Sequence, residues 1–212
     1  MSQHVSTAQA GGRRARNARG SGDRLRTEIL DAMSRLVADE DRMRPVPLSM
    51  REVAREAGVT APAIYRHFAD KESLTQAVID RFFSQLLETL DHAEEAHRDR
   101  APEHRLAALA HAYAGFAQEH PGWFSVMFSD GAPNETGVEQ VAARWRTAVS
   151  GLAETGLRLS QDPETAAVSV WSSVHGRVLL HRSVGALWSL GDVHTFIDEL
   201  TRALVTAGPA RE

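Results

Sequence analysis

Ten histidines and 28 acidic residues are the side chains with which this chain of 212 residues could carry out acid–base or metal chemistry. Their spacing matches no catalytic pattern, because no two histidines lie four residues apart around a glutamate, no glycine-rich phosphate loop occurs, and no serine lies in a nucleophile elbow. Cysteine is absent, which excludes disulfides, thiolate metal sites and a thiol nucleophile. We therefore expect a protein that is not an enzyme, with no cofactor and no metal site.

His104 and His111 are seven residues apart, which puts both on one face of a helix, two turns from each other. A metal ion could bind there, but solvated or buried histidines explain the spacing equally well. The pair therefore does not change the expectation of no metal site.

The stretch from Leu48 to Lys71 holds the strongest local signals in the chain. Ser49 can accept a hydrogen bond from a backbone N–H of the next turn while Glu52, three residues later, bonds back, which is a capping box at a helix start. We expect this helix to stop at Gly58, because glycine adopts the left-handed turn conformation without a Cβ clash.

Two more helix starts follow directly. Thr60 is placed to cap a short helix over residues 61–68, with Pro62 in its first turn, where the missing N–H costs little. Asp70 is placed to cap the helix after that. Two capped helices joined by a tight turn over residues 49–68 predict a helix-turn-helix.

The net charge of −4 is distributed unevenly along the chain. Residues 1–70 carry twelve arginines against nine acidic residues, a net charge of +3, whereas the remainder carries twelve basic against nineteen acidic residues, a net charge of −7. The basic end contains the helix-turn-helix, which favours nucleic acid as its partner. No run of eighteen apolar residues and no signal-peptide pattern occurs, so we expect a cytoplasmic protein with no membrane partner.

Residues 1–22 are rich in glycine, serine, alanine and arginine and have too few apolar side chains to form a core, so we predict a disordered basic tail. This tail could be a solvated leader. Alternatively, its arginines could contact DNA phosphates or the minor groove; they are Arg13, Arg14, Arg16 and Arg19.

The remaining apolar residues recur at helical spacing, with no strand pattern and no internal repeat. We therefore predict an all-α fold of about nine helices. An N-terminal three-helix domain over residues 23–70 contains the helix-turn-helix, and a long helix from about residue 70 to residue 98 joins it to a C-terminal helical bundle. The second domain covers residues 71–207.

The order of these parts resembles that of a TetR-family transcriptional regulator. The stretch LSMREVAREAGVTAPAIYRHFADKESL, from Leu48 to Leu74, follows the family pattern nearly position by position. In the C-terminal half, PGWFSVMF (residues 121–128) and WSSVHG (residues 171–176) are similar to a C-terminal domain named for a Trp-His-Gly signature. The two matches together cover most of residues 24–207.

This resemblance implies a homodimeric DNA-binding regulator. The family's usual member is a repressor that leaves a palindromic, double-stranded operator when a small effector binds the C-terminal domain. The alternative is a ligand-binding or adaptor protein of the same fold that does not bind an operator specifically.

The resemblance also implies that the second helix of the motif lies in the major groove. The residues at positions that face DNA are Ser49, Arg51, Thr60, Ala61, Ala63, Tyr65, His67 and Lys71. Two of them are alanines, so hydrogen-bonded readout of bases is sparse, and phosphate contacts and DNA shape carry more of the recognition. Tyr65 could instead be a half-buried core aromatic.

Large side chains are concentrated in the middle helices, where the family keeps an apolar effector pocket. The candidate pocket residues are His111, Tyr113, Phe116, Trp123, Phe124, Met127, Phe128, Trp145 and His175. Each of them alone could be ordinary core. As a group they favour an effector that is mostly apolar or aromatic.

The same resemblance implies that the last two helices of each subunit pair into a four-helix dimer interface. The residues that could supply its area are Trp171, Val174, Val178, Phe196, Leu200 and Leu204. His175 and Gly176 leave two interpretations open. They could belong to this interface, or His175 could bond a neighbouring carbonyl while Gly176 admits a crossing helix inside one subunit.

Overall fold

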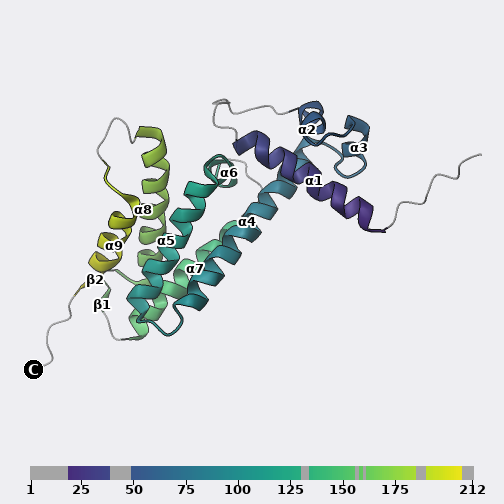
Figure 1. The fold of residues 1–212 in the computed structure, drawn as a ribbon. Helices are drawn as coiled ribbons and strands as arrows, with labels where there is room; N and C mark the ends of the chain where they lie inside the picture. The colour runs from purple at the N-terminus through teal and green to yellow at the C-terminus, as the bar shows by residue number, and fades with distance from the viewer. Residues whose placement is uncertain are drawn as a thin grey trace, which may run out of the picture.

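A computed structural model describes residues 19–38, 49–129, 134–155, 158–159, 161–184 and 190–206. Within these ranges the chain forms nine α-helices and one pair of two-residue antiparallel strands (Figure 1). The helices are α1 (Arg19–Ala38), α2 (Met50–Glu56), α3 (Ala61–Tyr65), α4 (Lys71–Ala96), α5 (Pro102–Glu119), α6 (Pro121–Met127), α7 (Glu135–Glu154), α8 (Pro163–Val184) and α9 (Val193–Leu204). The strands are β1 (Arg158–Leu159) and β2 (Val205–Thr206). The predicted all-α fold is therefore confirmed, with this short strand pair as the addition.

Helix α1 begins at Arg19, four residues before the predicted start at residue 23. Gly20 and Gly22 are poor helix formers and carry no apolar side chain, so the periodicity gives no sign of a helix before Leu25. Residues 19–22 of the predicted tail therefore belong to α1. The rest of the predicted tail, with Arg13, Arg14 and Arg16, lies outside the described residues.

The capping box that begins α2 is formed. The Ser49 N–H donates to Glu52 Oε2 at 2.8 Å, and the Glu52 N–H donates to Ser49 Oγ at 3.3 Å. Gly58 has φ +66°, which is the left-handed conformation that lets the chain turn directly into α3. Thr60 has the extended backbone of an N-cap, but its side chain makes no capping hydrogen bond.

Helix α4 runs through both halves of the molecule (Figure 1). Asp70 caps it by accepting a hydrogen bond from the Ser73 N–H at 2.7 Å, and this bond lowers the pKa of the Asp70 carboxyl. Leu74 near its start packs in the same continuous core as Leu90 near its end. The long connecting helix predicted from the sequence is therefore the element on which α1 and the C-terminal helices α5, α6 and α7 pack.

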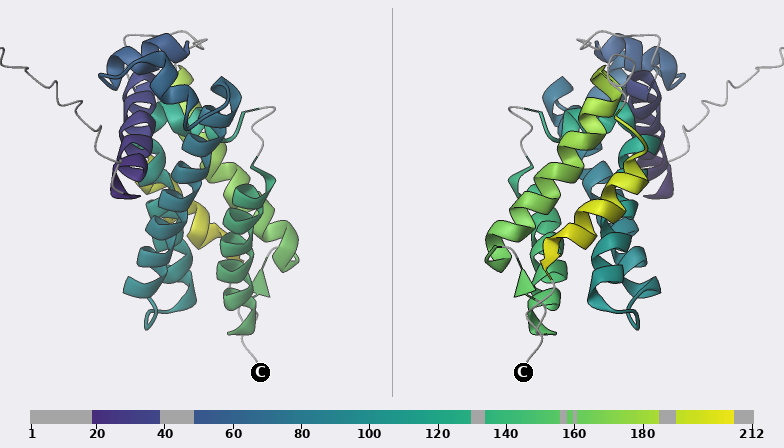
Figure 2. Two further views of the ribbon diagram at one scale, coloured as in Figure 1. Left: turned by 90° about the vertical axis from the view of Figure 1, so that its right-hand side faces the viewer. Right: turned by 90° about the vertical axis from the view of Figure 1, so that its left-hand side faces the viewer.

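The C-terminal helices surround α5, which packs against α4, α7, α8 and α9. Figure 2 shows α8 and α9 crossing on one face of the molecule, opposite α4. Trp145 of α7 and Tyr113 of α5 are both fully buried between these helices. The largest side chains of the domain thus lie at its centre, and α8 and α9 form one outer face.

Candidate DNA-binding surface and effector site

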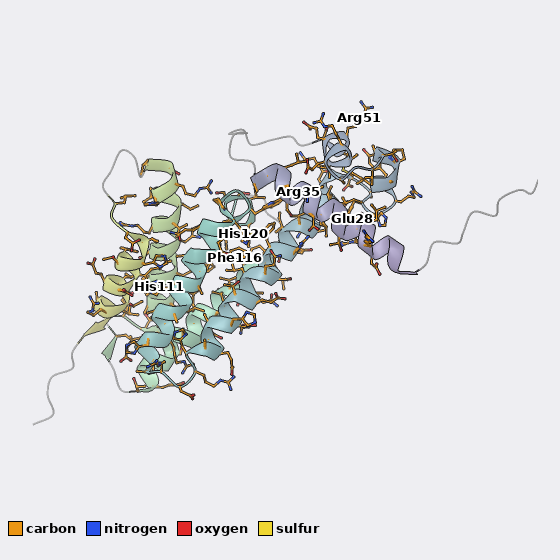
Figure 3. All side chains as sticks on the ribbon, in the orientation of Figure 1. Glu28, Arg35, Arg51, His111, Phe116 and His120 are labelled. Atoms are coloured by element: carbon orange, nitrogen blue, oxygen red, sulfur yellow. The ribbon has the colours of Figure 1, made fainter. Side chains whose placement is uncertain are left out.

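Four of the eight predicted DNA-facing side chains are exposed around α2 and α3. Ser49, Arg51 and Thr60 are exposed, and Tyr65 is 53% exposed, which excludes the alternative of a core aromatic. Figure 3 shows Arg51 on α2, at the end of the molecule far from α8 and α9. The capped helices α2 and α3 hold this surface through buried Val53 and Ile64, whereas the polar groups project outward.

The remaining predicted DNA contacts are less accessible. Ala63 is only 7% exposed, so its assignment to the DNA-facing surface is wrong: the methyl group packs beside Ile64 in the buried side of α3. Ala61 is half-buried against the core, and the side chains of His67 and Lys71 are partly exposed.

Two residues of α3 that the sequence analysis missed take the place of Ala63. Pro62 and Arg66 are exposed and lie on the same side of the helix as Tyr65, because residues three and four positions apart are neighbours on a helix surface. This spacing can be predicted from the sequence if Ile64 and Phe68 are first assigned to the buried side of the helix.

The basic side chains of this surface are available to a partner. Within the described parts of the chain, no carboxylate lies within ion-pair distance of Arg51, Arg55 or Arg66, although all three are exposed. Arg35 differs, because its Nε lies 2.8 Å from Glu56 Oε1. Guanidinium groups without an intramolecular carboxylate are suited to phosphates and to guanine edges.

Tyr113 is the centre of an aromatic cluster in the C-terminal domain. The Trp171 indole N–H donates to Tyr113 Oη at 3.0 Å, and Tyr113 Oη lies 2.9 Å from His175 Nδ1. The rings of Phe124 and Trp145 meet the Tyr113 ring edge-on at 5.3 and 5.6 Å. The structure thus brings together five of the predicted pocket residues, namely Tyr113, Phe124, Phe128, Trp145 and His175, and adds Trp171.

This aromatic cluster is electrically neutral at neutral pH. Burial raises the pKa of the Tyr113 phenol, so the hydroxyl keeps its proton beside His175 Nδ1, with which it shares a hydrogen bond. Burial also lowers the pKa of His175, which keeps that imidazole uncharged. The indole N–H of Trp145 is buried without a hydrogen-bond partner among the described residues. The cluster therefore suits an uncharged molecule and holds one unused donor.

Phe116 and Trp123 do not belong to the aromatic cluster. They lie with Phe82 and His120 where α4, α5 and α6 meet α1, and the rings of Trp123 and Phe82 stack at 5.2 Å. Figure 3 shows Phe116 and His120 in this region. A cavity of about 260 Å³ opens beside them. Met127 of α6 is buried in the core. Phe116 contacts the rings of Phe82 and His120, whereas Tyr113 contacts those of Phe124 and Trp145.

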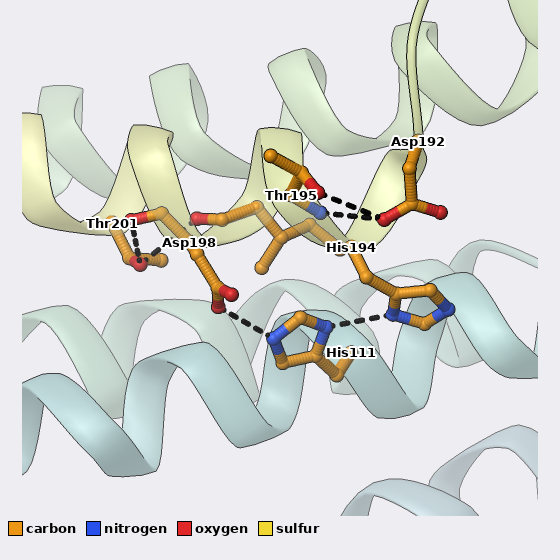
Figure 4. Close-up of polar contacts among 7 residues, drawn as sticks. His111, Asp192, His194, Thr195, Asp198 and Thr201 are labelled. Carbon is orange, nitrogen blue, oxygen red and sulfur yellow. Dashed lines mark hydrogen bonds and ion pairs between the residues drawn. The ribbon is translucent and has the colours of Figure 1, made fainter.

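His111 is also absent from the aromatic cluster, so its assignment to the effector pocket is wrong. Its side chain lies on the side of α5 that faces α9, where it contacts His194 and Asp198 (Figure 4). His111 and Tyr113 are two positions apart on α5, which places them about 200° apart around the helix axis.

His175 and Gly176 have different roles. His175 points inward and bonds the Tyr113 hydroxyl, not a backbone carbonyl. A Cβ added to Gly176 would meet nothing within 4 Å, so this glycine admits no crossing helix within the subunit and faces open space. The interpretation of the two residues as one internal packing pair is therefore wrong.

Three of the predicted dimer residues are buried inside the subunit. Val174, Val178 and Leu204 are at most 7% exposed and pack in the core, so they supply no interface area. Trp171, Phe196 and Leu200 are partly buried at the edge of the core.

The outer side of α8 instead carries four residues at a spacing of four: Val168, Ser172, Gly176 and Leu180. We call them the α8 stripe. Val168 is 57% and Leu180 46% exposed, which is unusual for large aliphatic side chains in this molecule.

No group of three histidine, aspartate or glutamate side chains in the described ranges is arranged to hold a metal ion. None of the helices that the structure describes is long and apolar enough to cross a membrane.

Two family models match the chain. Residues 46–78 match the model described as bacterial regulatory proteins, tetR family, and residues 106–204 match the model described as a tetracyclin repressor-like C-terminal domain.

Individual proteins are similar over large parts of the chain. The uncharacterized HTH-type transcriptional regulator Rv0681 of Mycobacterium tuberculosis is 28% identical over 159 residues, which are 73% of this chain and 70% of that protein. The HTH-type transcriptional activator FasR of Mycolicibacterium smegmatis is 30% identical over 139 residues, which are 66% of this chain and 59% of FasR. A solved structure of a protein of unknown function from Rhodococcus sp. RHA1 has a TM-score of 0.68 and 27% identity, covering 86% of this chain and 96% of that one.

Proposed function

Because this chain belongs to the TetR family of bacterial transcriptional regulators, we propose that it is a homodimeric repressor that leaves a palindromic operator when a small, mostly apolar effector binds. The observation that carries the proposal is the exposed surface around α2 and α3, where Arg51, Arg55 and Arg66 have no carboxylate within ion-pair distance among the described residues. The role is binding, without catalysis, and a protein in this role works in the cytoplasm, where the chromosome lies.

We assign operator contacts to both motif helices. Arg51 and the Ser49 hydroxyl of α2 contact phosphates, which sets the register of α3 in the major groove. From α3, Tyr65 contacts a phosphate and Arg66 contacts either a guanine edge or a phosphate. The exposed Thr60 and the partly exposed Ala61, His67 and Lys71 are kept as weaker candidates.

The α8 stripe is the proposed dimer surface. Ser172 and Gly176 have small side chains in the middle of the stripe, so a second helix can approach closely there, while Val168 and Leu180 supply apolar area at its ends. Phe196 and Leu200 of α9 extend this surface, and Arg177 lies over the Phe196 ring at 4.7 Å. A dimer formed here places two copies of α3 for two half-sites.

The aromatic cluster around Tyr113 is the proposed effector site. Its rings supply apolar surface, and the free indole N–H of Trp145 can donate to one acceptor oxygen or nitrogen of the effector. A charged effector is disfavoured, because His175 is neutral and the cluster holds no buried cation among its described members.

Helix α6 connects this effector site to the DNA-binding helices. Phe124 of α6 contacts the Tyr113 ring, and the neighbouring Trp123 donates its indole N–H to the Ser34 carbonyl of α1 at 3.1 Å. On the other side, Arg182 of α8 donates to Ser125 Oγ at 3.0 Å. An effector that displaces Phe124 therefore moves α1 relative to α8 and changes the separation of the two recognition helices, which lowers operator affinity.

The test is an electrophoretic mobility shift with the DNA that flanks the coding region. We expect a discrete complex that resists unrelated competitor DNA and whose affinity falls steeply between about 50 and 200 mM salt, as phosphate contacts require. Because FasR is described as an activator, in vitro transcription with and without the protein then decides between repression and activation.

A ligand-binding or adaptor protein without a specific operator is the second candidate. It is favoured by the half-buried Ala61 and the buried Ala63, which leave few base-reading groups on α3. Specific binding to an apolar compound, combined with equal affinity for flanking and unrelated DNA, would support this candidate over the repressor.

A further inference from the structure

A second group of titratable side chains lies between α5 and α9, outside both the DNA-binding surface and the aromatic cluster (Figure 4). His111 Nε2 lies 2.8 Å from Asp198 Oδ1, and His111 Nδ1 lies 2.9 Å from His194 Nδ1. The ring centroids are 5.0 Å apart, so the two nitrogens, not the ring faces, make the closest approach. We call His111 and His194 the imidazole pair.

The chemistry of the contacts limits where the hydrogens can be. An ionised carboxylate only accepts, so His111 Nε2 donates to Asp198. Between the two Nδ1 atoms, 2.9 Å apart, there is then room for one hydrogen, which one ring carries and donates to the other. The contact between the two rings therefore depends on one proton held between two nitrogens.

We propose that the imidazole pair is a pH-sensitive switch, in which one shared proton joins α5 to the start of α9 and protonation of both rings separates them. The first added proton goes to the free Nε2 of His194 and leaves the shared bond intact. The second must go to the Nδ1 that lacks a hydrogen, and two N–H groups cannot face each other at 2.9 Å. Histidine is the side chain whose ordinary charge change falls between about pH 5 and 8, so about pH 7.5 and about pH 5 are the conditions to compare.

The surroundings of the imidazole pair favour separation once both rings are charged. His194 is the second residue of α9, where the positive end of the helix dipole repels a cation. Asp198 holds the charged His111 in place. Asp192 caps α9 by accepting from the Thr195 N–H at 2.8 Å, and its carboxylate attracts His194 toward solvent.

Other charged groups lie on different sides of the two helices. The turn neighbours of His111 on α5 are Ala107, Ala108, Ala114 and Gly115, which carry no charge. From α8, the closest cation is Arg177, which lies over Phe196 on the opposite side of α9 from His194. The switch therefore involves the imidazole pair, Asp192 and Asp198.

Opening the switch loosens the first turn of α9, and Phe196 belongs to that turn. Because Phe196 and Leu200 extend the proposed dimer surface, acid then weakens the dimer. This effect on the dimer rests on the proposed function, whereas the switch itself does not. A regulator built this way releases DNA at acid pH without an effector.

The switch is tested in the full chain with His194→Asn, whose side-chain amide can still donate to His111 Nδ1 but cannot be protonated. His104→Asn is the matched control, since His104 is an exposed histidine of the same helix α5. We expect amide hydrogen exchange in residues 193–204 to be equal in wild type and His194→Asn at about pH 7.5, and at least about tenfold faster in wild type at about pH 5. Comparison at the same pH cancels the intrinsic pH dependence of exchange.

The dimer is measured separately by analytical ultracentrifugation. We expect the wild-type and His104→Asn dissociation constants to rise about tenfold between about pH 7.5 and 5, and that of His194→Asn to change less than about threefold. Equal exchange in wild type and His194→Asn at the acid pH overturns the switch. A chain that is monomeric at both pH values, but shows the exchange difference, overturns the proposed dimer and leaves the switch supported.

Discussion

The indole N–H of Trp123 donates to the backbone carbonyl of Ser34 at 3.1 Å, which joins α6 of the C-terminal domain to α1 of the DNA-binding domain. Next to it, a Cβ added to Gly122 would lie 2.7 Å from the Val37 carbonyl oxygen, so only glycine allows the two helices to come this close. The two domains therefore meet through backbone groups of α1, which a side-chain rearrangement cannot easily replace.

Gly122→Ala is expected to disturb this contact. The new methyl group clashes with backbone, so we expect the free energy of unfolding to fall by about 1–3 kcal/mol in urea denaturation, together with weaker operator binding. Gly151→Ala is the control, because a Cβ there meets nothing within 4 Å and helix propensity favours alanine. Equal stability of the two variants would show that α1 and α6 are not in close contact in solution.

Arg66→Ala is expected to weaken operator binding without affecting the fold. If Arg66 reads a guanine edge, affinity falls by about 1–3 kcal/mol and discrimination at one base pair is lost. If it contacts a phosphate, affinity falls for every sequence and the salt slope drops by about one. Fluorescence anisotropy over a salt series distinguishes the two, with Arg98→Ala, at the far end of α4, as the control. Unchanged affinity and unchanged salt slope would remove Arg66 from the interface.

Leu180→Glu is expected to convert the dimer to a monomer. The carboxylate would be buried without a partner at one end of a close helix contact, which is a costly change in an interface. Analytical ultracentrifugation measures the mass, and Thr147→Glu on the exposed side of α7 is the control for added negative charge. A dimer that survives Leu180→Glu would show that the α8 stripe is not its interface.

His175 is expected to make folding stability sensitive to acid. Burial lowers its pKa in the folded state below the ordinary value of about 6.5, so at lower pH the unfolded chain binds more protons than the folded one. Stability is therefore fully present above about pH 6.5 and is lost as pH falls below that value. Urea denaturation at a series of pH values should show this slope in wild type and a smaller one in His175→Gln. The same slope in both proteins would mean that His175 is not protonated on unfolding.

Local signals in the sequence predicted the helices well. The capping box of Ser49 and Glu52, the left-handed Gly58 and the cap at Asp70 are formed as expected, because each depends on residues within one turn of each other. The start of α1 was missed, since Gly20 and Gly22 are poor helix formers and give no periodic apolar signal. The position of Ala63 was also missed, since the same helix spacing allows more than one choice of buried face.

The site in the C-terminal domain could be predicted only in part. Aromatic composition indicated the residues around Tyr113, but it did not separate them from Phe116 and Trp123, which face α4 and α1. Likewise, the apolar residues of α8 and α9 showed no difference between Val174, which is buried in the subunit, and Leu180, which is exposed. An apolar helix face indicates that it is covered, but it does not indicate whether the same subunit or a partner covers it.

By itself, the sequence of this protein determined the all-α class, the helix-turn-helix and the family resemblance, because caps, turns and helical periodicity are interactions between near neighbours in the chain. Only the tertiary structure decided that His111 meets His194, 83 residues away, that the buried indole N–H of Trp145 has no partner among the described residues, and that Gly176 faces open space. These facts depend on how helices far apart in the chain are rotated and packed against one another, and helical periodicity places no limit on that choice.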